Sequence, residues 1–453
     1  MQTFDLIVIG AGSGLNISSA AAEKGLKVAV VEKGPMGGTC LNRGCIPSKI
    51  IIHSADVAET IRNSKLFGIN SKISSIDFKK IIARASGIVD RDAKEIEEGI
   101  KEDKNTTLFK DEAKFVAERT LRVGKETIRG YKVVIAAGTR PSIPNIEGIK
   151  DTDFITSDEA LRLKKQPKAM TILGGGYIAA ELAHFYGSLG TKINIIQRGS
   201  LLVPNEDEEI ARKFTEIFSR KYNVLAGFQA TKVFKKNKKF VVVAESMKSR
   251  KTLESDQLLV ATGRMPNTDV LDVKKGKVGV DEKGFVKTNK YLETTAKNTW
   301  ALGDIAGKFL FKHSANLEAQ YVYHNSILGK RLPVDYSAMP HAIFSSPQVA
   351  GVGLREQDLK QRKNNYSVGK YRYINSGMGI ALQDNDGFVK IFADRKTKKI
   401  LGCHILGTDA STLIHEVIVV MKNNLSADAI SNSVHVHPAL SEVVQRAVNS
   451  IGW

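Results

Sequence analysis

Two segments of the chain, about 160 residues apart, repeat the order strand, glycine-rich turn, helix, strand. The first runs from DLIVIG through GAGSGL and ISSAAAEKG to KVAVVEKG, and the second from AMTILGGG through YIAAELAHFYGSLG to KINIIQRG. A buried strand that ends in closely spaced glycines and leads into a helix is typical of a dinucleotide-binding βαβ unit. One such segment would be a weak indication, but two predict an α/β protein with two nucleotide sites.

In the first segment, Gly10 and Gly12 allow a tight turn and a close approach of the backbone to a pyrophosphate at the helix N-terminus. Glu32 follows 20 residues after Gly12, where a carboxylate can accept hydrogen bonds from a ribose diol. Leu15 stands where the third glycine of this fingerprint is expected. Helix and strand should therefore pack less closely there, with Gly14 as a partial compensation.

In the second segment, Gly174 and Gly176 are followed by Ala179 at the third fingerprint position, and the second strand ends in Gln197 and Arg198. A site specific for NADH usually presents a carboxylate at this strand end, which would repel the 2′-phosphate of NADPH. A guanidinium can instead donate charge-assisted hydrogen bonds to that phosphate. Arg198 therefore favours NADPH over NADH; the alternative is that it is only a solvent-facing residue.

The chain has three cysteines, too few for a disulfide-stapled scaffold. Cys403 lies in the apolar stretch ILGCHIL and is expected to be buried in a strand, whereas Cys40 and Cys45 lie in GGTCLNRGCIPSK, directly after the first nucleotide unit. Their five-residue spacing does not fit a metal knuckle, so we expect no metal site. The adjacent nucleotide site and glycines favour a reversible disulfide over inert helix residues, and such a disulfide requires a thiol of lowered pKa or a nearby base.

A candidate base lies near the C-terminus, in HVHPALSEVV. His437 precedes Pro438, and Glu442 is expected one turn into the helix that this proline begins. A carboxylate that binds one imidazole nitrogen fixes the tautomer and leaves the other nitrogen to move a proton. A histidine before a proline is more often structural, and 392 residues separate His437 from Cys45. A catalytic meeting of the two must therefore cross domains or subunits.

Composition excludes several function classes. The net charge is +19, but the lysines are spread along the chain, and their densest cluster, residues 235–239, lies in an expected turn between strands. We therefore expect a solvated basic surface, or a preference for anionic ligands and acidic partners, rather than a nucleic-acid partner. The chain has no run of ~18 uncharged apolar residues, and its first ten residues resemble a strand more than a signal peptide. The sequence predicts a cytoplasmic protein without a membrane partner.

Five motifs, GGTCLNRGCIPSK, GGGYIAAE, VATGRMPN, ALGDIAG and HVHPALSE, occur in an order that resembles the flavoprotein pyridine nucleotide-disulfide oxidoreductases. That family includes dihydrolipoamide dehydrogenase, glutathione reductase and mycothione reductase, and the match spans nearly the whole chain. The resemblance implies FAD and NADPH or NADH as cofactors, and a homodimer. It also implies an FAD-binding domain with the redox disulfide at 1–146, an NAD(P)H-binding domain at 147–265, a return to the FAD-binding domain at 266–335, and a C-terminal α+β interface domain at 336–453.

The resemblance further implies a role for each residue of the redox centre. Cys45 would be the thiol nearest the flavin, and Cys40 the thiol that meets the substrate. His437, orientated by Glu442, would serve as acid and base on the substrate thiol, and would come from the partner subunit.

The same resemblance implies the cofactor contacts. Lys49 would pair with Glu181 beside the flavin ring, Asp304 would hold the ribityl chain, and Tyr177 would cover the nicotinamide pocket. The full set of implied cofactor residues lies at the glycine turns and at the ends of strands: Gly10, Gly12, Ser13, Gly14, Glu32, Lys33, Gly38, Thr39, Lys49, Ala137, Gly138, Thr139, Gly174, Gly176, Tyr177, Ile178, Glu181, Arg198, Gly263, Gly303 and Asp304.

The implied reaction moves electrons between NAD(P)H and a dithiol or disulfide substrate through FAD and the Cys40–Cys45 disulfide. CIPSK and the double histidine of HVHP make dihydrolipoamide dehydrogenase the first expectation. Arg198, Tyr177, Ala179 and the turn GAGSGLN favour the alternative, an NADPH-dependent reductase of a low-molecular-weight disulfide similar to mycothione or glutathione reductase. An NAD(P)H oxidase or a mercuric reductase-like flavoprotein is more remote, and the usual C-terminal cysteine pair of the latter is absent.

Overall fold

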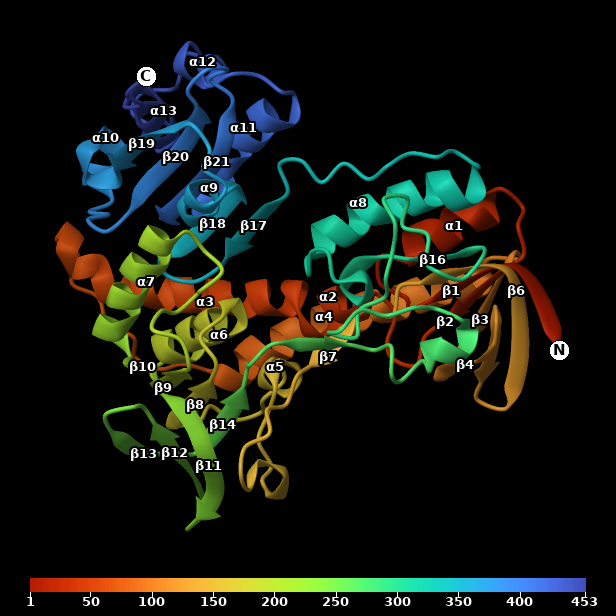
Figure 1. Ribbon diagram of the computed structural model, residues 1–453. Helices are drawn as coiled ribbons and strands as arrows, with labels where there is room; N and C mark the ends of the chain where they lie inside the picture. The colour runs from red at the N-terminus through yellow and green to blue at the C-terminus, as the bar shows by residue number, and fades with distance from the viewer.

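The computed structural model describes residues 1–453, and its largest sheet contains the first glycine-rich segment (Figure 1). Its strand β1 (Gln2–Ile9) is apolar on both faces and completely buried at Leu6, Ile7 and Val8, as expected of a strand in a parallel sheet covered on both sides. The strands lie in the order β3 (Thr106–Phe109), β2 (Val28–Val31), β1 (Gln2–Ile9), β6 (Glu126–Ile135), β5 (Thr120–Val123) and β4 (Ala113–Ala117). β16 (Thr299–Ala301) returns to pair in parallel with β6, so a segment that follows the second glycine-rich unit completes the first sheet.

Five helices belong to the same part of the molecule: α1 (Leu15–Glu23), α2 (Gly38–Arg43), α3 (Cys45–Asn63), α4 (Phe78–Glu102) and α8 (Lys312–Val322). α1 and α8 lie side by side, although about 290 residues separate them, because Ala21 and Ala22 of α1 and Ala315 and Ala319 of α8 share one buried apolar cluster. The longest helix, α4, is strongly amphipathic and buries only one face. None of the helices has both the length and the apolar composition needed to cross a membrane.

The second glycine-rich segment forms a smaller parallel sheet in the order β10 (Asn223–Ala226), β9 (Lys192–Gln197), β8 (Ala169–Leu173) and β14 (Gln257–Val260). The short helix α5 (Ser157–Ala160) precedes it, α6 (Tyr177–Ser188) joins β8 to β9, and α7 (Glu208–Lys221) follows. β11 (Gln229–Lys236), β12 (Lys239–Glu245) and β13 (Arg250–Ser255) form an antiparallel meander. The lysine cluster forms the β11–β12 turn, where Asn237 and Lys238 both have positive φ, as expected for a two-residue hairpin.

The two near-repeats IAAGTRP and LVATGRMP pair directly with each other. β7 (Thr139–Pro141) and β15 (Arg264–Pro266) form a two-stranded antiparallel ribbon between the two nucleotide-binding sheets. The similarity of the two segments does not by itself indicate this pairing. The domain boundaries proposed from the sequence stay a prediction.

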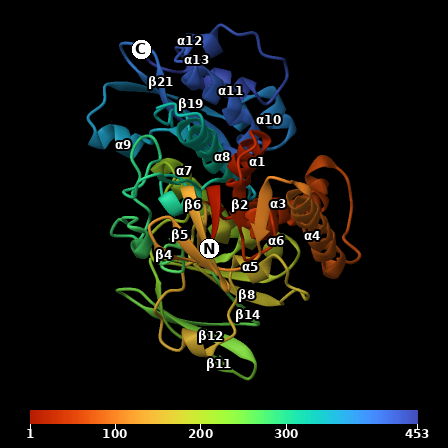
Figure 2. The same cartoon turned by 90° about the vertical axis from the view of Figure 1, so that its right-hand side faces the viewer.

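The C-terminal part contains an antiparallel sheet in the order β17 (Pro340–Ile343), β18 (Gln348–Gly353), β21 (Ile400–Gly407), β20 (Phe388–Asp394) and β19 (Tyr366–Arg372). Its helices are α9 (Glu356–Gln361), α10 (Gly377–Ala381), α11 (Ala410–Lys422), α12 (Asp428–Ser431) and α13 (Glu442–Asn449). Cys403 on β21 is completely buried, as predicted. Figures 1 and 2 show this sheet and its helices at one end of the molecule and the β11–β13 meander at the other.

One sequence expectation about this part is wrong. Helix α13 begins at Glu442 and not at Pro438. The residues before the helix form single turns, and the Glu442 carboxylate reaches back to accept a hydrogen bond from the Ala439 amide at 3.2 Å. Glu442 thus lies at the first turn of the helix, where a negative charge is favourable.

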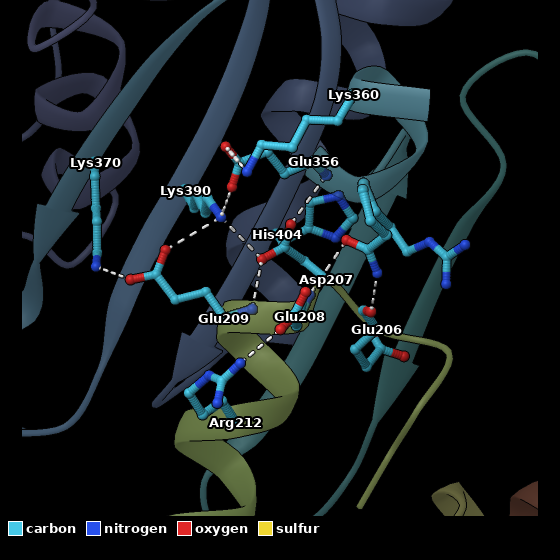
Figure 3. A network of polar contacts seen from close by, with 12 residues as sticks. Glu206, Asp207, Glu208, Glu209, Arg212, Glu356, Lys360, Lys370, Lys390 and His404 are labelled. Carbon is cyan, nitrogen blue, oxygen red and sulfur yellow. Dashed lines mark hydrogen bonds and ion pairs between the residues drawn. The ribbon is translucent and has the colours of Figure 1, made fainter. Parts of the chain in front are cut away.

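A buried ion network joins the start of α7 to the C-terminal sheet (Figure 3). The Lys390 side chain of β20 is 4% exposed, and its Nζ lies 3.1 Å from Asp207, 3.1 Å from Glu209 and 2.7 Å from Glu356. Asp207 also caps α7, because its carboxylate accepts a hydrogen bond from the Glu209 amide at 3.1 Å. Burial alone would raise the pKa of Glu356, but hydrogen bonds from Lys390 and Lys360 hold it at about 2. The single buried lysine therefore balances several carboxylates at this junction.

Candidate active site

A cavity of about 1370 Å³ lies where the two nucleotide-binding parts and the C-terminal part meet. Its walls include the turn after β1, helices α2 and α3, and the N-termini of α6 and α8. Most residues proposed from the sequence line this cavity: Gly10, Gly12, Ser13, Glu32, Lys33, Gly38, Thr39, Cys40, Cys45, Lys49, Ala137, Gly138, Thr139, Tyr177, Ile178, Glu181, Gly303 and Asp304. The others, Gly14, Gly174, Gly176, Arg198, Gly263, His437 and Glu442, lie outside its lining.

Glycines allow the start of α2, the helix that contains Cys40, to lie close to the turn after β1. Gly38 has φ +65°, and a Cβ at this position would lie 2.7 Å from the Cα of Gly12. The two backbones therefore touch, which brings the start of α2 directly against the turn after β1. Gly14 makes a second close approach, since a Cβ there would lie 2.6 Å from the Gly10 carbonyl oxygen. Close packing of α1 on β1 thus occurs at Gly14, one residue before Leu15.

Two carboxylates, those of Glu32 and Asp304, line the cavity together with the glycine turn. Glu32 is held by backbone amides, from Ala11 at 3.0 Å and from Gly34 at 2.7 Å, so its carboxylate is fixed at the cavity edge. Asp304, in the short helix η4 (Gly303–Ala306), accepts a hydrogen bond from Thr139 at 2.8 Å, while burial raises the pKa of its carboxyl. A glycine turn at a helix N-terminus with a fixed carboxylate on the following strand fits the pyrophosphate and ribose of a dinucleotide such as FAD.

The two cysteines differ in their protonation. Cys40 lies in α2 and Cys45 begins α3, and both are free thiols. A hydrogen bond from the Cys40 thiol, helped by the charge of Lys49, lowers the pKa of Cys45 to about 7. The same hydrogen bond, together with burial, raises the pKa of Cys40, because Cys40 is the donor. Near neutral pH the reduced pair therefore holds its negative charge on Cys45 and its proton on Cys40.

An ion pair links helix α3, which begins at Cys45, to helix α6 of the second glycine-rich segment. The Nζ of Lys49, on α3, lies 2.9 and 2.8 Å from the two carboxylate oxygens of Glu181, on α6. Glu181 also accepts a hydrogen bond from the Phe344 amide at 3.0 Å, and the Lys49 Nζ lies 4.4 Å from the centre of the Phe344 ring. Both ends of the pair are thus held in place beside Cys45.

The second glycine turn repeats the geometry of the first. Gly174 has φ +111°, and a Cβ there would lie 2.3 Å from the Ala261 carbonyl oxygen, while at Gly10, with φ +104°, it would lie 2.4 Å from that of Ala136. Tyr177 is the first residue of α6, lines the cavity and is 38% exposed. Arg198 follows β9 and is exposed, with no carboxylate within salt-bridge distance.

The proposed base lies elsewhere in the chain. His437 Nδ1 lies 3.1 and 3.2 Å from the two Glu442 oxygens, and this hydrogen bond lowers the pKa of Glu442. The His437 side chain is 75% exposed and lies outside the cavity. A single chain therefore assembles the histidine–glutamate pair and the cysteine pair separately and does not bring them together.

Several cavity residues escaped the sequence reasoning, including Lys312, His313, Arg264 and His341. Arg264 donates hydrogen bonds to the side chain and the carbonyl of Thr139, both at 2.8 Å. It lies in the motif VATGRMPN, which could have indicated it. Lys312 and His313 follow ALGDIAG by only a few residues, but their meeting with the redox segment depends on the tertiary fold.

Comparisons with known proteins agree over nearly the whole length. Residues 4–322 match the family model described as pyridine nucleotide-disulphide oxidoreductase, and residues 339–448 match its dimerisation domain. Mycothione reductase of Mycobacterium tuberculosis is 35% identical over 99% of both chains. Dihydrolipoyl dehydrogenase of Chlamydia trachomatis is 32% identical over 98% of this chain and 95% of that protein. The Cu(II) complex of the HOCl-induced flavoprotein disulfide reductase RclA from Escherichia coli superposes with a TM-score of 0.89, at 27% identity over 99% of both chains.

Proposed function

The chain belongs to the pyridine nucleotide-disulphide oxidoreductase family, and we propose that it is an NADPH-dependent reductase of a low-molecular-weight disulfide. Members of this family use FAD and NAD(P)H, and the chain is an FAD-dependent oxidoreductase of this class. The observation that carries the proposal is the exposed, unpaired Arg198 at the end of β9.

The segment that carries Arg198 packs directly on the second glycine turn. A Cβ at Gly175 would lie 2.7 Å from the Leu202 side chain and 2.9 Å from that of Gln197, and the Val203 amide donates to the Gly175 carbonyl at 2.6 Å. Arg198 follows Gln197, so its backbone lies beside the second glycine turn. No carboxylate occupies this strand end. An unpaired guanidinium there suits the 2′-phosphate of NADPH, which it can bind through two parallel hydrogen bonds.

The side chains around the cysteines account for the thiol chemistry. Bound FAD supplies hydride acceptance and two-electron transfer, which no side chain can provide. After reduction of the Cys40–Cys45 disulfide, Lys49 stabilises the Cys45 thiolate. The deprotonated Cys40 sulfur attacks one substrate sulfur, which forms a mixed disulfide and releases the first substrate thiolate. The Cys45 thiolate then attacks Cys40, which restores the disulfide and releases the second thiolate.

The proton chemistry requires His437, which we infer comes from the second subunit of a homodimer. Glu442 occupies Nδ1, so Nε2 remains to take the Cys40 proton and to protonate the leaving thiolate. Two valines that precede His437 on the loop are exposed to solvent: Val434 is 100% exposed and Val436 is 75% exposed. Such side chains are expected to be covered by a partner, and they lie in the part that matches the dimerisation domain.

Mixed dimers test this arrangement. A dimer that combines a Cys45→Ser subunit with a His437→Gln subunit should keep about half of the wild-type activity, because one of its two sites then has an intact cysteine pair and an intact partner histidine. Both homodimeric variants should be nearly inactive. The mixed dimer can be purified with two different affinity tags and assayed directly. If the histidine serves its own chain, the mixed dimer will be as inactive as either parent.

The Arg198→Ala variant tests the coenzyme. We expect KM for NADPH to rise about 10- to 100-fold, since a charge-assisted hydrogen bond contributes about 1.5–3 kcal/mol, while KM for NADH should stay unchanged. The matched control is Arg212→Ala, an exposed arginine on α7 that pairs only with Glu208. A wild-type enzyme that prefers NADH, or an unchanged KM for NADPH in the variant, would contradict the proposal.

Dihydrolipoamide dehydrogenase is the second candidate function. It is favoured by His435, the first histidine of HVHP, whose Nε2 lies 3.0 Å from Glu416 and which thereby anchors the loop that carries His437. Steady-state assays separate the two candidates. NADPH-dependent reduction of mycothione or glutathione disulfide would support the first, and NAD⁺-dependent oxidation of dihydrolipoamide would support the second.

A further inference from the structure

Glu206 and His341 form a hydrogen-bonded pair in the wall of the active-site cavity. His341, on β17, lines the cavity, and its Nε2 lies 2.7 Å from a carboxylate oxygen of Glu206, two residues before α7. The Glu206 side chain is only 6% exposed. The imidazole ring lies at 11° to the Phe311 ring, and a Cβ at Gly351 would lie 2.6 Å from its Cε1. The neighbouring groups therefore hold this imidazole in one orientation.

Glu206 ends a segment that packs on the second glycine turn. A Cβ at Gly175 would lie 2.7 Å from the Leu202 side chain, and the Val203 amide donates to the Gly175 carbonyl at 2.6 Å. The Glu206 amide in turn donates to the Val203 carbonyl at 3.0 Å. Two successive backbone hydrogen bonds thus connect Glu206 to the turn at which the phosphates of a nicotinamide coenzyme are expected to bind.

The strand β17 has a second contact with the same nucleotide-binding part. Phe344 follows β17 directly, and its amide donates to the Glu181 carboxylate of α6 at 3.0 Å. Helix α6 begins where the second glycine turn ends. Ile343 of β17 and Ala179 of α6 also belong to one buried apolar cluster. The glycine turn is therefore tied to β17 on both sides, through Glu181 in the helix that follows it and through Glu206 in the segment packed on it.

Other contacts between this segment and the C-terminal part lie away from the cavity. Arg355 donates to the Asn205 carbonyl at 3.0 Å, and Lys390 pairs with Asp207 in the network of Figure 3. Neither of these two donors lines the cavity, whereas His341 does. The outer contacts attach the segment to the C-terminal part, and His341 holds it at the cavity itself.

We propose that Glu206 and His341 are a positioning pair for hydride transfer from the nicotinamide coenzyme to FAD. The inference rests on the reaction class of the family and is independent of the coenzyme and the disulfide proposed above. The pair forms and breaks no bond of the substrate. It fixes the coenzyme-binding turn against the cavity wall, and a misplacement of about 1 Å between reacting groups can slow a reaction about 100-fold. Loss of the pair should therefore impair alignment more than binding.

The test is anaerobic stopped-flow measurement of flavin reduction in the holoenzyme, with whichever of NADPH and NADH the wild type uses faster. In His341→Leu, an apolar side chain of similar size without a donor, we expect the limiting rate to fall about 10- to 100-fold. The coenzyme Kd, taken from the concentration dependence of the same rates, should stay nearly unchanged. With coenzyme deuterated at C4, the isotope effect should rise, because hydride transfer then limits the rate. His341→Gln, whose amide can donate to Glu206, should recover most of the rate.

Two measurements without coenzyme distinguish lost positioning from general damage. Hydrogen–deuterium exchange of residues 198–207 should be faster in His341→Leu than in the wild type, because the segment is less firmly held. The FAD content, and the rate at which iodoacetamide alkylates the dithionite-reduced cysteines, should equal those of the wild type.

A double-mutant cycle tests whether the two residues act as a pair. Glu206→Ala should slow flavin reduction as much as His341→Leu, and the double variant should be no slower than either. The matched control is His415→Leu, a histidine that lines the same cavity but hydrogen-bonds only to Thr412 of its own helix; it should leave flavin reduction unchanged. The proposal is overturned by a wild-type rate and isotope effect in His341→Leu, by additive effects in the double variant, or by loss of FAD and of cysteine reactivity together with the rate.

Discussion

Replacing Cys45 by serine should reduce disulfide reductase activity by about 10³-fold or more, because the variant lacks the sulfur that re-forms the disulfide and releases the product. The same variant should lose the long-wavelength absorption band that a thiolate next to an oxidised flavin produces. The measurement is an anaerobic titration with dithionite followed by visible spectroscopy, together with steady-state assays. Survival of both the band and the activity would show that the cysteine mechanism is wrong.

The pH dependence of that band gives a second readout for the same residue. The pKa of Cys45 is lowered to about 7, so the thiolate and the band should be present above pH 7 and disappear as pH falls below it. Cys403→Ser is the matched control, since Cys403 is completely buried on β21 and contributes no sulfur to the cavity. Its band and midpoint should equal those of the wild type.

Replacing Lys390 by alanine should cause the largest loss of stability. The variant leaves Asp207, Glu209 and Glu356 without their shared cation, and removing one partner of a buried ion network costs about 3–5 kcal/mol. In a protein of 453 residues we expect the thermal unfolding midpoint to fall by roughly 3–5 °C. Differential scanning calorimetry of the FAD-loaded enzyme checks this result.

Lys370→Ala is the control within the same network. Lys370 pairs with Glu209, but its side chain is 42% exposed, so its loss should cost less than about 1 kcal/mol. The pH dependence separates the two lysines further. Because the pKa of Glu356 is held at about 2 in the folded state, its contribution to stability is complete above its usual pKa and is lost as pH falls toward 2. Lys390→Ala should flatten this acid dependence, and equal effects of the two variants would contradict the role of the buried network.

The sequence predicted the local structure well because glycines and apolar strands act over short distances. Gly10 and Gly174 have the positive φ that only a glycine accepts easily, and each lies at the turn where a strand meets a helix. The buried strand around Cys403 and the hairpin turn after Lys236 follow from similar local rules. The start of α13 was predicted wrongly, because the helix begins at Glu442, whose carboxylate accepts a hydrogen bond from the Ala439 amide, and not at the proline.

The identity of the cysteine pair was predictable from the sequence, but its protonation was not. Spacing and neighbouring motifs indicated Cys40 and Cys45. The family resemblance implied that Lys49 pairs with Glu181, and the structure places the Lys49 Nζ 2.8–2.9 Å from the Glu181 carboxylate oxygens. Spacing could not show which sulfur holds the proton. That property depends on the hydrogen bond between the two sulfurs and on the charges around them.

By itself, the sequence indicated the two nucleotide-binding units, the cysteine pair and the histidine–glutamate pair, since each is a motif of residues close together along the chain. Only the tertiary structure decided that Gly38 rests on Gly12, that β7 pairs with β15, that Lys390 joins the C-terminal sheet to α7 and that Lys312 lines the same cavity as Cys40. These contacts join residues that are far apart along the chain. They form because whole sheets and helices bury their apolar faces against one another, and no local pattern records which side chains then meet.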